Sequence, residues 1–303
     1  MKHLIIIILV SIIYPSLAEA QELKFQPPWN NPPESAINFT IDGIDNIPDL
    51  YGDIVDPQLV VFFAGNQFMV LEELISAFKQ EYPQYQRVFV ETLPPGILAQ
   101  QIEKGSLTIG NMRITLKPDI YTAGTQRIAQ LKDKLSNTRL YAKNKLSLMV
   151  QLHNPKNIKG LKDLNVSSVR ISMPNPEWEG IARLIIKAYE NAGGKELVKA
   201  VMDEKVKNGT TFLTKIHHRQ SPLRILNNLS DVAPVWHTEV AFQKMKGHPV
   251  DEITIPDAEN EIASYYAGIL KDAPHRQAAK DFLNFLTSAE GQRIYKKYGF
   301  ITN

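Results

Sequence analysis

The sequence of 303 residues contains no cysteine. This absence excludes disulfide bonds, thiolate metal sites, a cysteine nucleophile and a lipid-anchored cysteine. Net charge is also small, because 34 basic and 32 acidic residues leave only +2. A nearly neutral chain is not expected to bind nucleic acid or an anionic membrane through a basic surface. Folding must therefore rest on a hydrophobic core, and a chain of this length can supply one.

The sequence also lacks the short motifs that mark common catalytic sites. It has no G-x-S-x-G elbow, no H-E-x-x-H zinc motif, no P-loop and no G-x-G-x-x-G after a predicted strand. His237 and Glu239 could form an orienting pair, but no nucleophile is implied beside them. We therefore expect a protein that is not an enzyme and that carries no cofactor.

Long hydrophobic runs are absent beyond the N-terminus. There, a basic start precedes the apolar run Leu4–Tyr14, and residues 18–20 (Ala-Glu-Ala) have the small side chains that signal peptidase requires. The run is too short to cross a bilayer, so residues 1–20 are predicted to be a cleaved secretory signal and the periplasm is the expected location. Residues 21–57 are rich in proline and asparagine and are predicted to form an extended arm, or to be disordered after processing.

The clearest structural signal lies between residues 59 and 82. Leu59–Ala64 is an apolar run, which favours a strand covered on both faces. Gly65 to Gln67 interrupts the run, and apolar residues then recur at helical spacing from Phe68 up to Pro83. A helix start beyond the carboxyl end of a buried strand is where open α/β sheets bind ligands. Asn66 and Gln67 are therefore candidate donors, with a helix cap and its neighbour as the structural alternative.

Strands and helices alternate along the rest of the chain, which predicts an α/β fold. Leu140–Leu152 and Ile262–Leu270 have the composition of longer strands, and each could cross between two lobes. A helix is predicted over Thr125–Leu135, and others close the chain after residue 276.

Five stretches carry a resemblance to a known family through their shared order and spacing. They are VVFFAGNQFMVLEELISAFKQEYP, GILAQQIEKGSLTIG, NPEWEGIARLIIKAYENAGG, SDVAPVWHTEVA and APHRQAAKDFLNFLTSAEGQRIYKKYGF. Over residues 58 to 301 the chain resembles type II periplasmic solute-binding proteins, nearest the molybdate-binding branch of ABC transporter substrate-binding proteins. The last stretch is the most specific, because a Ser/Thr-x-x-Gly-Gln step followed by a helix ending Lys-Tyr-Gly-Phe closes many of these proteins.

The resemblance implies a two-lobed α/β fold with two crossing hinge strands and a ligand between the lobes. Lobe 1 would comprise residues 58–143 with 262–303, and lobe 2 would comprise residues 144–261. Such proteins close around a small molecule or ion and present it to an inner-membrane transporter permease. We expect a monomer with no nucleic-acid partner.

The predicted site departs from the molybdate pattern. The family carries hydroxyl side chains at the first two strand–helix turns, whereas this chain has Gly65-Asn66-Gln67 and Leu93-Pro94-Pro95-Gly96. A proline offers no amide donor. We therefore expect a small oxyanion or carboxylate as the solute, with molybdate itself not assured. The candidate ligand-binding residues are Asn66, Gln67, Thr92, Gly96, Arg113, Trp236 and His237.

Each candidate also has a structural reading. Arg113 can bind an oxyanion bidentately or can form a surface salt bridge. Trp178 can line the cleft or pack between the lobes. Glu177 and Glu179 beside it can provide carboxylates for a cation.

Two alternative functions remain open. A nitrogen and oxygen site for zinc, copper or another divalent ion would make the protein a metal-ion carrier in the same fold. Its ligands would come from His217, His218, His237 and Glu239. A protein that docks a partner with its lobes and its proline-rich arm, and that binds no small solute, is the second alternative.

Overall fold

The structure is a computed structural model that describes residues 50–302, except residues 110–111, 178 and 216–219. The predicted signal (1–20) and most of the predicted arm (21–57) lie outside the described residues, as do Trp178, His217 and His218. None of the helices in the described part of the chain combines the length and apolar character that a membrane crossing requires.

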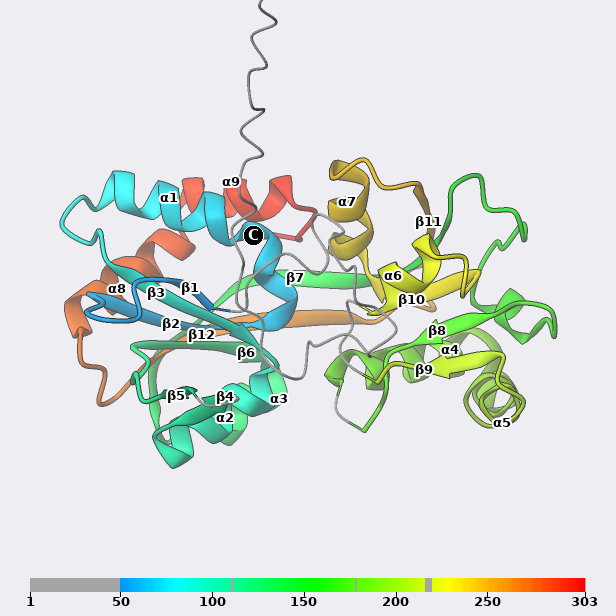
Figure 1. Cartoon of the computed structure of the whole chain (residues 1–303), viewed down its shortest axis with the longest axis horizontal. Coiled ribbons are helices and arrows are strands. Elements are labelled where there is room, and N and C mark those ends of the chain that lie inside the picture. Colours follow the sequence, from blue (N-terminus) through cyan, green and yellow to red (C-terminus); the bar gives the residue numbers. More distant parts are fainter. Residues whose placement is uncertain (1–49, 110–111, 178, 216–219, 303) are drawn as a thin grey trace, which may run out of the picture.

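Two lobes lie side by side and are joined by two long strands (Figure 1). The lobe 1 sheet has the order β1-β3-β2-β6-β12-β7. Its strands are β1 (Leu50–Gly52), β2 (Leu59–Ala64), β3 (Val88–Leu93), β6 (Ile120–Gly124), β7 (Leu135–Gln151) and β12 (Ile262–Leu270). β4 (Leu107–Ile109) and β5 (Met112–Ile114) form a separate hairpin sheet. The helices of this lobe are η3 (Gly65–Val70), α1 (Leu71–Glu81), α2 (Pro95–Lys104), α3 (Thr125–Gln130), α8 (Arg276–Leu286) and α9 (Ala289–Lys297).

The sheet of lobe 2 continues from β7 through β10, β8 and β9, and β11 also pairs with β7. Its strands are β8 (Ile171–Met173), β9 (Thr211–Leu213), β10 (Val232–Trp236) and β11 (Val250–Thr254). Its helices are η4 (Leu161–Asn165), α4 (Gly180–Lys199), η5 (Ala200–Glu204), α5 (Lys205–Lys207), α6 (Gln220–Leu226) and α7 (His237–Met245).

Alternate residues of the buried strands face opposite helical layers, as the apolar runs predict. In β2, Leu59, Val61 and Phe63 belong to the core beneath α1, α8 and α9, whereas Val60 and Phe62 face α2. In lobe 2 the even residues of β7 from Leu146 onward pack against α4, and Met149 packs against α6 and α7. Both sheets are therefore covered on both faces, which confirms the predicted α/β class.

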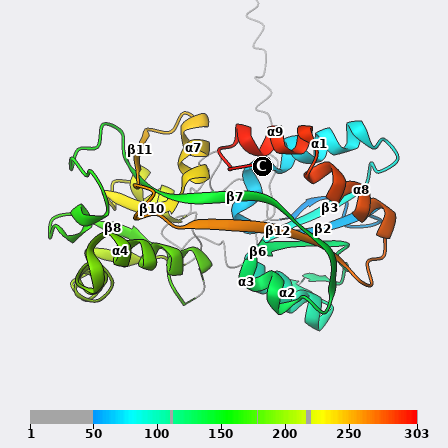
Figure 2. The same cartoon turned by 180° about the vertical axis from the view of Figure 1, so that it is seen from behind.

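The two predicted crossing strands are present, and Figure 2 shows both running between the lobes. β7 pairs with β12 up to Lys145 and with β10 from Leu146 onward, so it changes partner within one continuous strand. β7 begins at Leu135, five residues before the predicted start, and the helix predicted over Thr125–Leu135 ends at Gln130. Leu135 joins the sheet because it pairs with Leu270, a contact that local sequence does not reveal.

Candidate functional site

The first strand–helix turn places Asn66 at the end of β2. The turn is a 3-10 helix over Gly65–Val70, and α1 begins only at Leu71 rather than near Phe68 as predicted. Gly65 lets this turn pass close to β3, because a Cβ there would lie 3.2 Å from the carbonyl oxygen of Thr92. The half-buried Asn66 donates a hydrogen bond from Nδ2 to the hydroxyl of Tyr265 on β12 at 2.5 Å.

Tyr265 also contacts Trp236, at the end of β10 in lobe 2. The two ring centroids are 6.2 Å apart, and the ring planes meet at 68°. Asn66 and Trp236, predicted from distant parts of the sequence, therefore touch the same side chain where the lobes meet. Burial raises the pKa of Tyr265 above its ordinary value, so its hydroxyl stays protonated. Sequence reasoning missed Tyr265; its only signal was a polar ring within a predicted crossing strand.

His237 begins α7 and is held by other parts of the protein. Its Nδ1 lies 2.5 Å from Oε1 of Glu252, which also accepts a hydrogen bond from the Ser147 hydroxyl. Burial raises the pKa of Glu252, but the hydrogen bonds from His237 and Ser147 outweigh it and lower that pKa overall. On its other side, the ring approaches the position that a Cβ at Gly299 would occupy, at 3.3 Å. His237 thus packs against both β11 and the C-terminal segment of lobe 1.

The residues proposed for a metal site are not gathered in the described part of the chain. Within it, no group of three or more His, Cys, Asp and Glu residues could hold a metal ion. Glu239 is buried at 2% exposure on α7, and His217 and His218 lie outside the described residues.

Gln67 is fully buried inside lobe 1 rather than open to a solute. Its Nε2 donates to the hydroxyl of Tyr141, and its Oε1 accepts from the hydroxyl of Tyr295 at 2.8 Å. Both ends of the amide are therefore used within the core. These contacts support a structural role for Gln67 as the alternative to the predicted ligand donor, because a residue one position from Asn66 in a 3-10 turn faces a different direction.

The second turn brings a cation to the start of α2. Thr92 is 1% exposed in β3, and Gly96 is the second residue of α2. A Cβ at Gly96 would lie 3.1 Å from Nη2 of Arg127, an exposed residue of α3, so the glycine lets the guanidinium lie against this helix start. Arg127 was not among the predicted residues. Arg113, which was predicted, lies on β5 of the separate hairpin sheet and is exposed.

A hydrogen bond joins the two lobes next to Arg127. Gln126 of α3 accepts it from Nη1 of Arg183 of α4 at 3.3 Å. Figure 2 shows these two helices on facing sides of the lobes. Arg127 is the residue after Gln126 in α3, and its Nη1 donates to Gln130 at 2.9 Å, so each lobe has an arginine at or next to this contact. Sequence patterns did not predict Arg127 or Arg183, because charged residues on amphipathic helices usually form a solvated face.

Glu179 occupies the start of α4 in lobe 2. Its Oε1 accepts hydrogen bonds from the backbone N–H of Asn175, at 3.3 Å, and from the Thr214 hydroxyl. Its Oε2 is buried and has no hydrogen-bond partner among the described residues. Burial raises the pKa of Glu179 to about 7, against the partial lowering by these two donors.

Most of the polar groups described at or near the junction of the lobes suit an anion. Arg127 and Arg183 supply charge, and Asn66 and Tyr265 supply neutral polar groups near the hinge. Glu179 is the exception, because it is a hydrogen-bond acceptor. Two lobes that contribute polar groups to a shared boundary define a binding protein that can close around a solute.

Comparison with known proteins agrees with this class. Residues 59–301 match the model of the family described as bacterial extracellular solute-binding protein, and the chain belongs to this family. The match confirms the predicted solute-binding class. It also agrees with the expectation that the protein is not an enzyme, because the family is defined by solute binding.

Individual relatives share only a minority of their residues with this chain. The chain is 28% identical over 186 residues to the putative ABC transporter substrate-binding lipoprotein YvgL of Bacillus subtilis, an alignment that covers 59% of this chain and 65% of that protein. The sulfate-binding protein SubI of Mycobacterium tuberculosis has a similar fold, with a TM-score of 0.65 and 19% identity over 80% of this chain and 85% of that one. The periplasmic molybdate-binding protein of Azotobacter vinelandii also has a TM-score of 0.65, with 17% identity over 81% of this chain and 99% of that one. At such identities the structural likeness concerns the fold.

Proposed function

We propose that the protein captures a small oxyanion or carboxylate between its lobes and delivers it to an inner-membrane transporter. The observation that carries the proposal is the contact between the lobes at Gln126, which accepts a hydrogen bond from Arg183 of lobe 2 and directly precedes Arg127 in α3 of lobe 1. A guanidinium binds carboxylates and oxyanions through paired hydrogen bonds. An anion that bonds an arginine of each lobe would stabilise the closed arrangement of the lobes. The names of the sulfate-binding and molybdate-binding structures support an anionic solute.

The proposed site runs along the junction from the hinge to the start of α4. At the hinge we assign ligand contact to Asn66 and Trp236, which meet at Tyr265, with His237 next to them. Towards the opening, Gly96 and Arg127 contribute from lobe 1 and Arg183 from lobe 2. Thr92 and Arg113 remain candidates at the second turn and on the hairpin. We further propose that residues 1–20 are removed on export and that the protein acts as a monomer in the periplasm.

Calorimetric titration of the purified protein with sulfate, molybdate, phosphate, citrate, Zn²⁺ and Cu²⁺ tests this function. We expect at least one anion to bind and to stabilise the fold by about 2.7 kcal/mol at a hundred times its Kd. Arg127→Gln and Arg183→Gln should each raise the Kd for that anion about 10- to 100-fold, because each removes a charge-assisted hydrogen bond. Arg139→Gln is the matched control, because the exposed Arg139 bonds Asn284 at 2.8 Å.

Other outcomes would favour the alternatives. Stabilisation by Zn²⁺ or Cu²⁺ alone, lost in His237→Ala, would point to a metal-ion carrier. If the folded protein binds none of the anions and metal ions in the panel, the result would contradict solute capture and would favour a docking role.

A further inference from the structure

We propose that Glu179 is a specificity-determining residue that accepts a hydrogen bond from the solute, so that the protein selects anions carrying an O–H or N–H donor. The inference rests on the proposed function and names the class of anion. It arises from a buried carboxylate within a boundary that otherwise suits negative charge.

The two oxygens of Glu179 differ in their surroundings. Oε1 is satisfied twice, by the backbone N–H of Asn175 and by the hydroxyl of Thr214. Oε2 is equally withdrawn from solvent, yet no donor in the described part of the chain reaches it. Buried acceptors are almost always paired, and leaving one unpaired is costly. A donor on the solute would complete this carboxylate.

The location of Glu179 links it to the arginines. Glu179 is the cap residue directly before α4, and Arg183 lies in the first turn of that helix, four residues further along the chain. Arg183 reaches Gln126 in lobe 1, so the start of α4 lies next to the other lobe. The start of α4 also follows β8, which runs parallel to β10, and the end of β10 carries Trp236. Glu179 therefore lies at the same edge of the lobe 2 sheet as the proposed site.

This combination of groups sets two demands on a solute. The arginines favour a carboxylate or an oxyanion. The carboxylate of Glu179, which is ionised at pH 8 because its pKa is about 7, favours a solute that can donate. Sulfate and hydrogen phosphate have the same shape and charge at pH 8, but only hydrogen phosphate carries an O–H. Succinate and malate differ in the same way, by one hydroxyl.

The test is calorimetric titration at pH 8 with these two matched pairs. We expect the parent protein to prefer the donor-bearing member of the pair it binds by about 10- to 100-fold. Glu179→Gln replaces the free acceptor by an amide that can donate, so the preference should vanish or reverse. Glu190→Gln, an exposed residue on the same helix, should leave the preference unchanged.

Each result has a separate meaning. Equal binding of both members of a pair by the parent protein, or an unchanged preference in folded Glu179→Gln, would overturn the role of Glu179 while anion capture stands. The parent protein's own preference decides the question if the variant fails to fold. Failure of the folded parent to bind any of the four anions, or any other anion tried, would overturn the proposed function and this inference with it.

Discussion

At the scale of single residues, the buried polar groups of lobe 1 explain why adjacent positions have different roles. Asn66 is half-buried and reaches Tyr265 near the hinge, whereas Gln67 is enclosed between Tyr141 and Tyr295. The sequence shows two consecutive amides and cannot separate them, because only the 3-10 geometry of the turn decides which side chain enters the core.

Replacing Gln67 should affect stability rather than binding. Gln67→Leu leaves the hydroxyls of Tyr141 and Tyr295 without their amide partner, and we expect a loss of about 3 kcal/mol in the free energy of unfolding. Urea unfolding measures this loss, and titration with the solute should give an unchanged Kd. Asn66→Ala is the matched comparison, with weaker binding and a smaller loss of stability. Parental stability in Gln67→Leu would show that these hydrogen bonds do not stabilise the fold, and weakened binding would show that Gln67 acts at the ligand.

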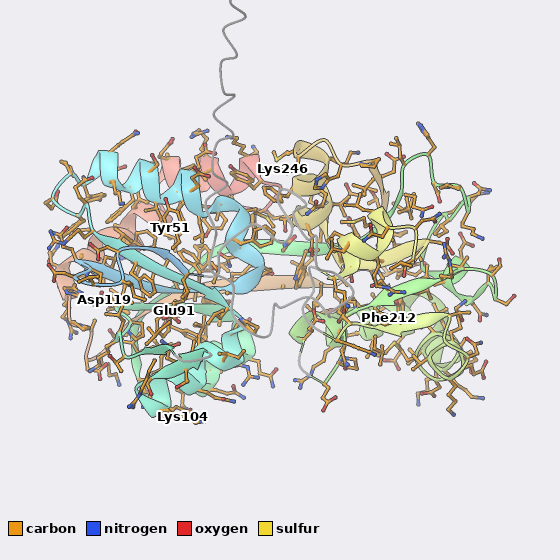
Figure 3. The ribbon with its side chains drawn as sticks, in the orientation of Figure 1. Tyr51, Glu91, Lys104, Asp119, Phe212 and Lys246 are labelled. Carbon is orange, nitrogen blue, oxygen red and sulfur yellow. The ribbon has the colours of Figure 1, made fainter. Side chains whose placement is uncertain are left out.

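Glu91 makes the stability of the protein depend on pH. It lies in β3 within lobe 1 (Figure 3), is fully buried, and accepts a hydrogen bond from Gln101 at 3.0 Å. Burial raises its pKa from 4.5 to about 7, against the smaller opposite effect of that bond. Between these values the folded state holds a proton that the unfolded chain has released. The stability from this group is thus complete below pH 4.5 and is lost as the pH rises through 7.

Glu91→Gln should remove this dependence, because an amide does not titrate. From the shift in pKa, we expect the variant to gain on the order of 3 kcal/mol over the parent between pH 4.5 and pH 8. Urea unfolding at pH 5 and pH 8 gives the comparison. Glu103→Gln, an exposed change on α2, is the control and should track the parent at both pH values. A constant difference between Glu91→Gln and the parent across this range would mean that Glu91 is already ionised in the fold.

At the scale of elements, the C-terminal helices give physical meaning to the most specific stretch of the sequence. The Ser288 hydroxyl caps α9 by accepting the N–H of Gly291 at 3.2 Å. Gln292 donates from Nε2 to the carbonyls of Tyr141 and Leu286, at 2.9 and 3.0 Å. Gly291 permits this close packing, because a Cβ there would lie 2.3 Å from the carbonyl oxygen of Phe285. The Ser-x-x-Gly-Gln step thus fixes α9 against α8 and β7.

Gly291→Ala should therefore push α9 away from α8. We expect a loss of about 1–3 kcal/mol in the free energy of unfolding, the usual cost of overpacking. Gly160→Ala is the control, because its backbone is extended and a Cβ there meets nothing within 4 Å. Thermal unfolding of both variants measures the difference. Equal melting temperatures for the two would show that α9 can shift without cost.

Elements were more predictable than the site they build. The apolar run of β2, the helical period of α1 and the crossing strand β12 follow from local patterns, and the structure contains all three. The start of β7 and the contact of Arg183 with Gln126 depend on pairing between distant segments, which periodicity does not encode. Glu179 was noted only as a carboxylate beside Trp178, because burial of one oxygen is a tertiary property.

At the scale of the whole molecule, the lobes share a strand and also touch directly. β7 contributes to both sheets, and Phe68 of lobe 1 packs against Phe242 of α7 with centroids 5.4 Å apart. Further from the hinge, Arg183 reaches Gln126. Under the proposed function, we expect the contact between α3 and α4 to open for solute entry and release while the hinge contacts hold.

Because the chain has no cysteine, two introduced thiols can test this opening without side reactions. Gln126→Cys with Arg183→Cys, bridged by a flexible bis-maleimide after loading with the best-bound anion, should release that anion at least roughly tenfold more slowly than the same double variant without the bridge, since closure controls dissociation and both proteins lack Arg183. Stopped-flow displacement measures the rate. Bridging Gln126→Cys to Gln130→Cys within α3 alters lobe 1 alone and should leave release unchanged. Equal release rates for the Gln126→Cys/Arg183→Cys protein with and without its bridge would mean that the solute leaves by a path that needs no separation of α3 from α4.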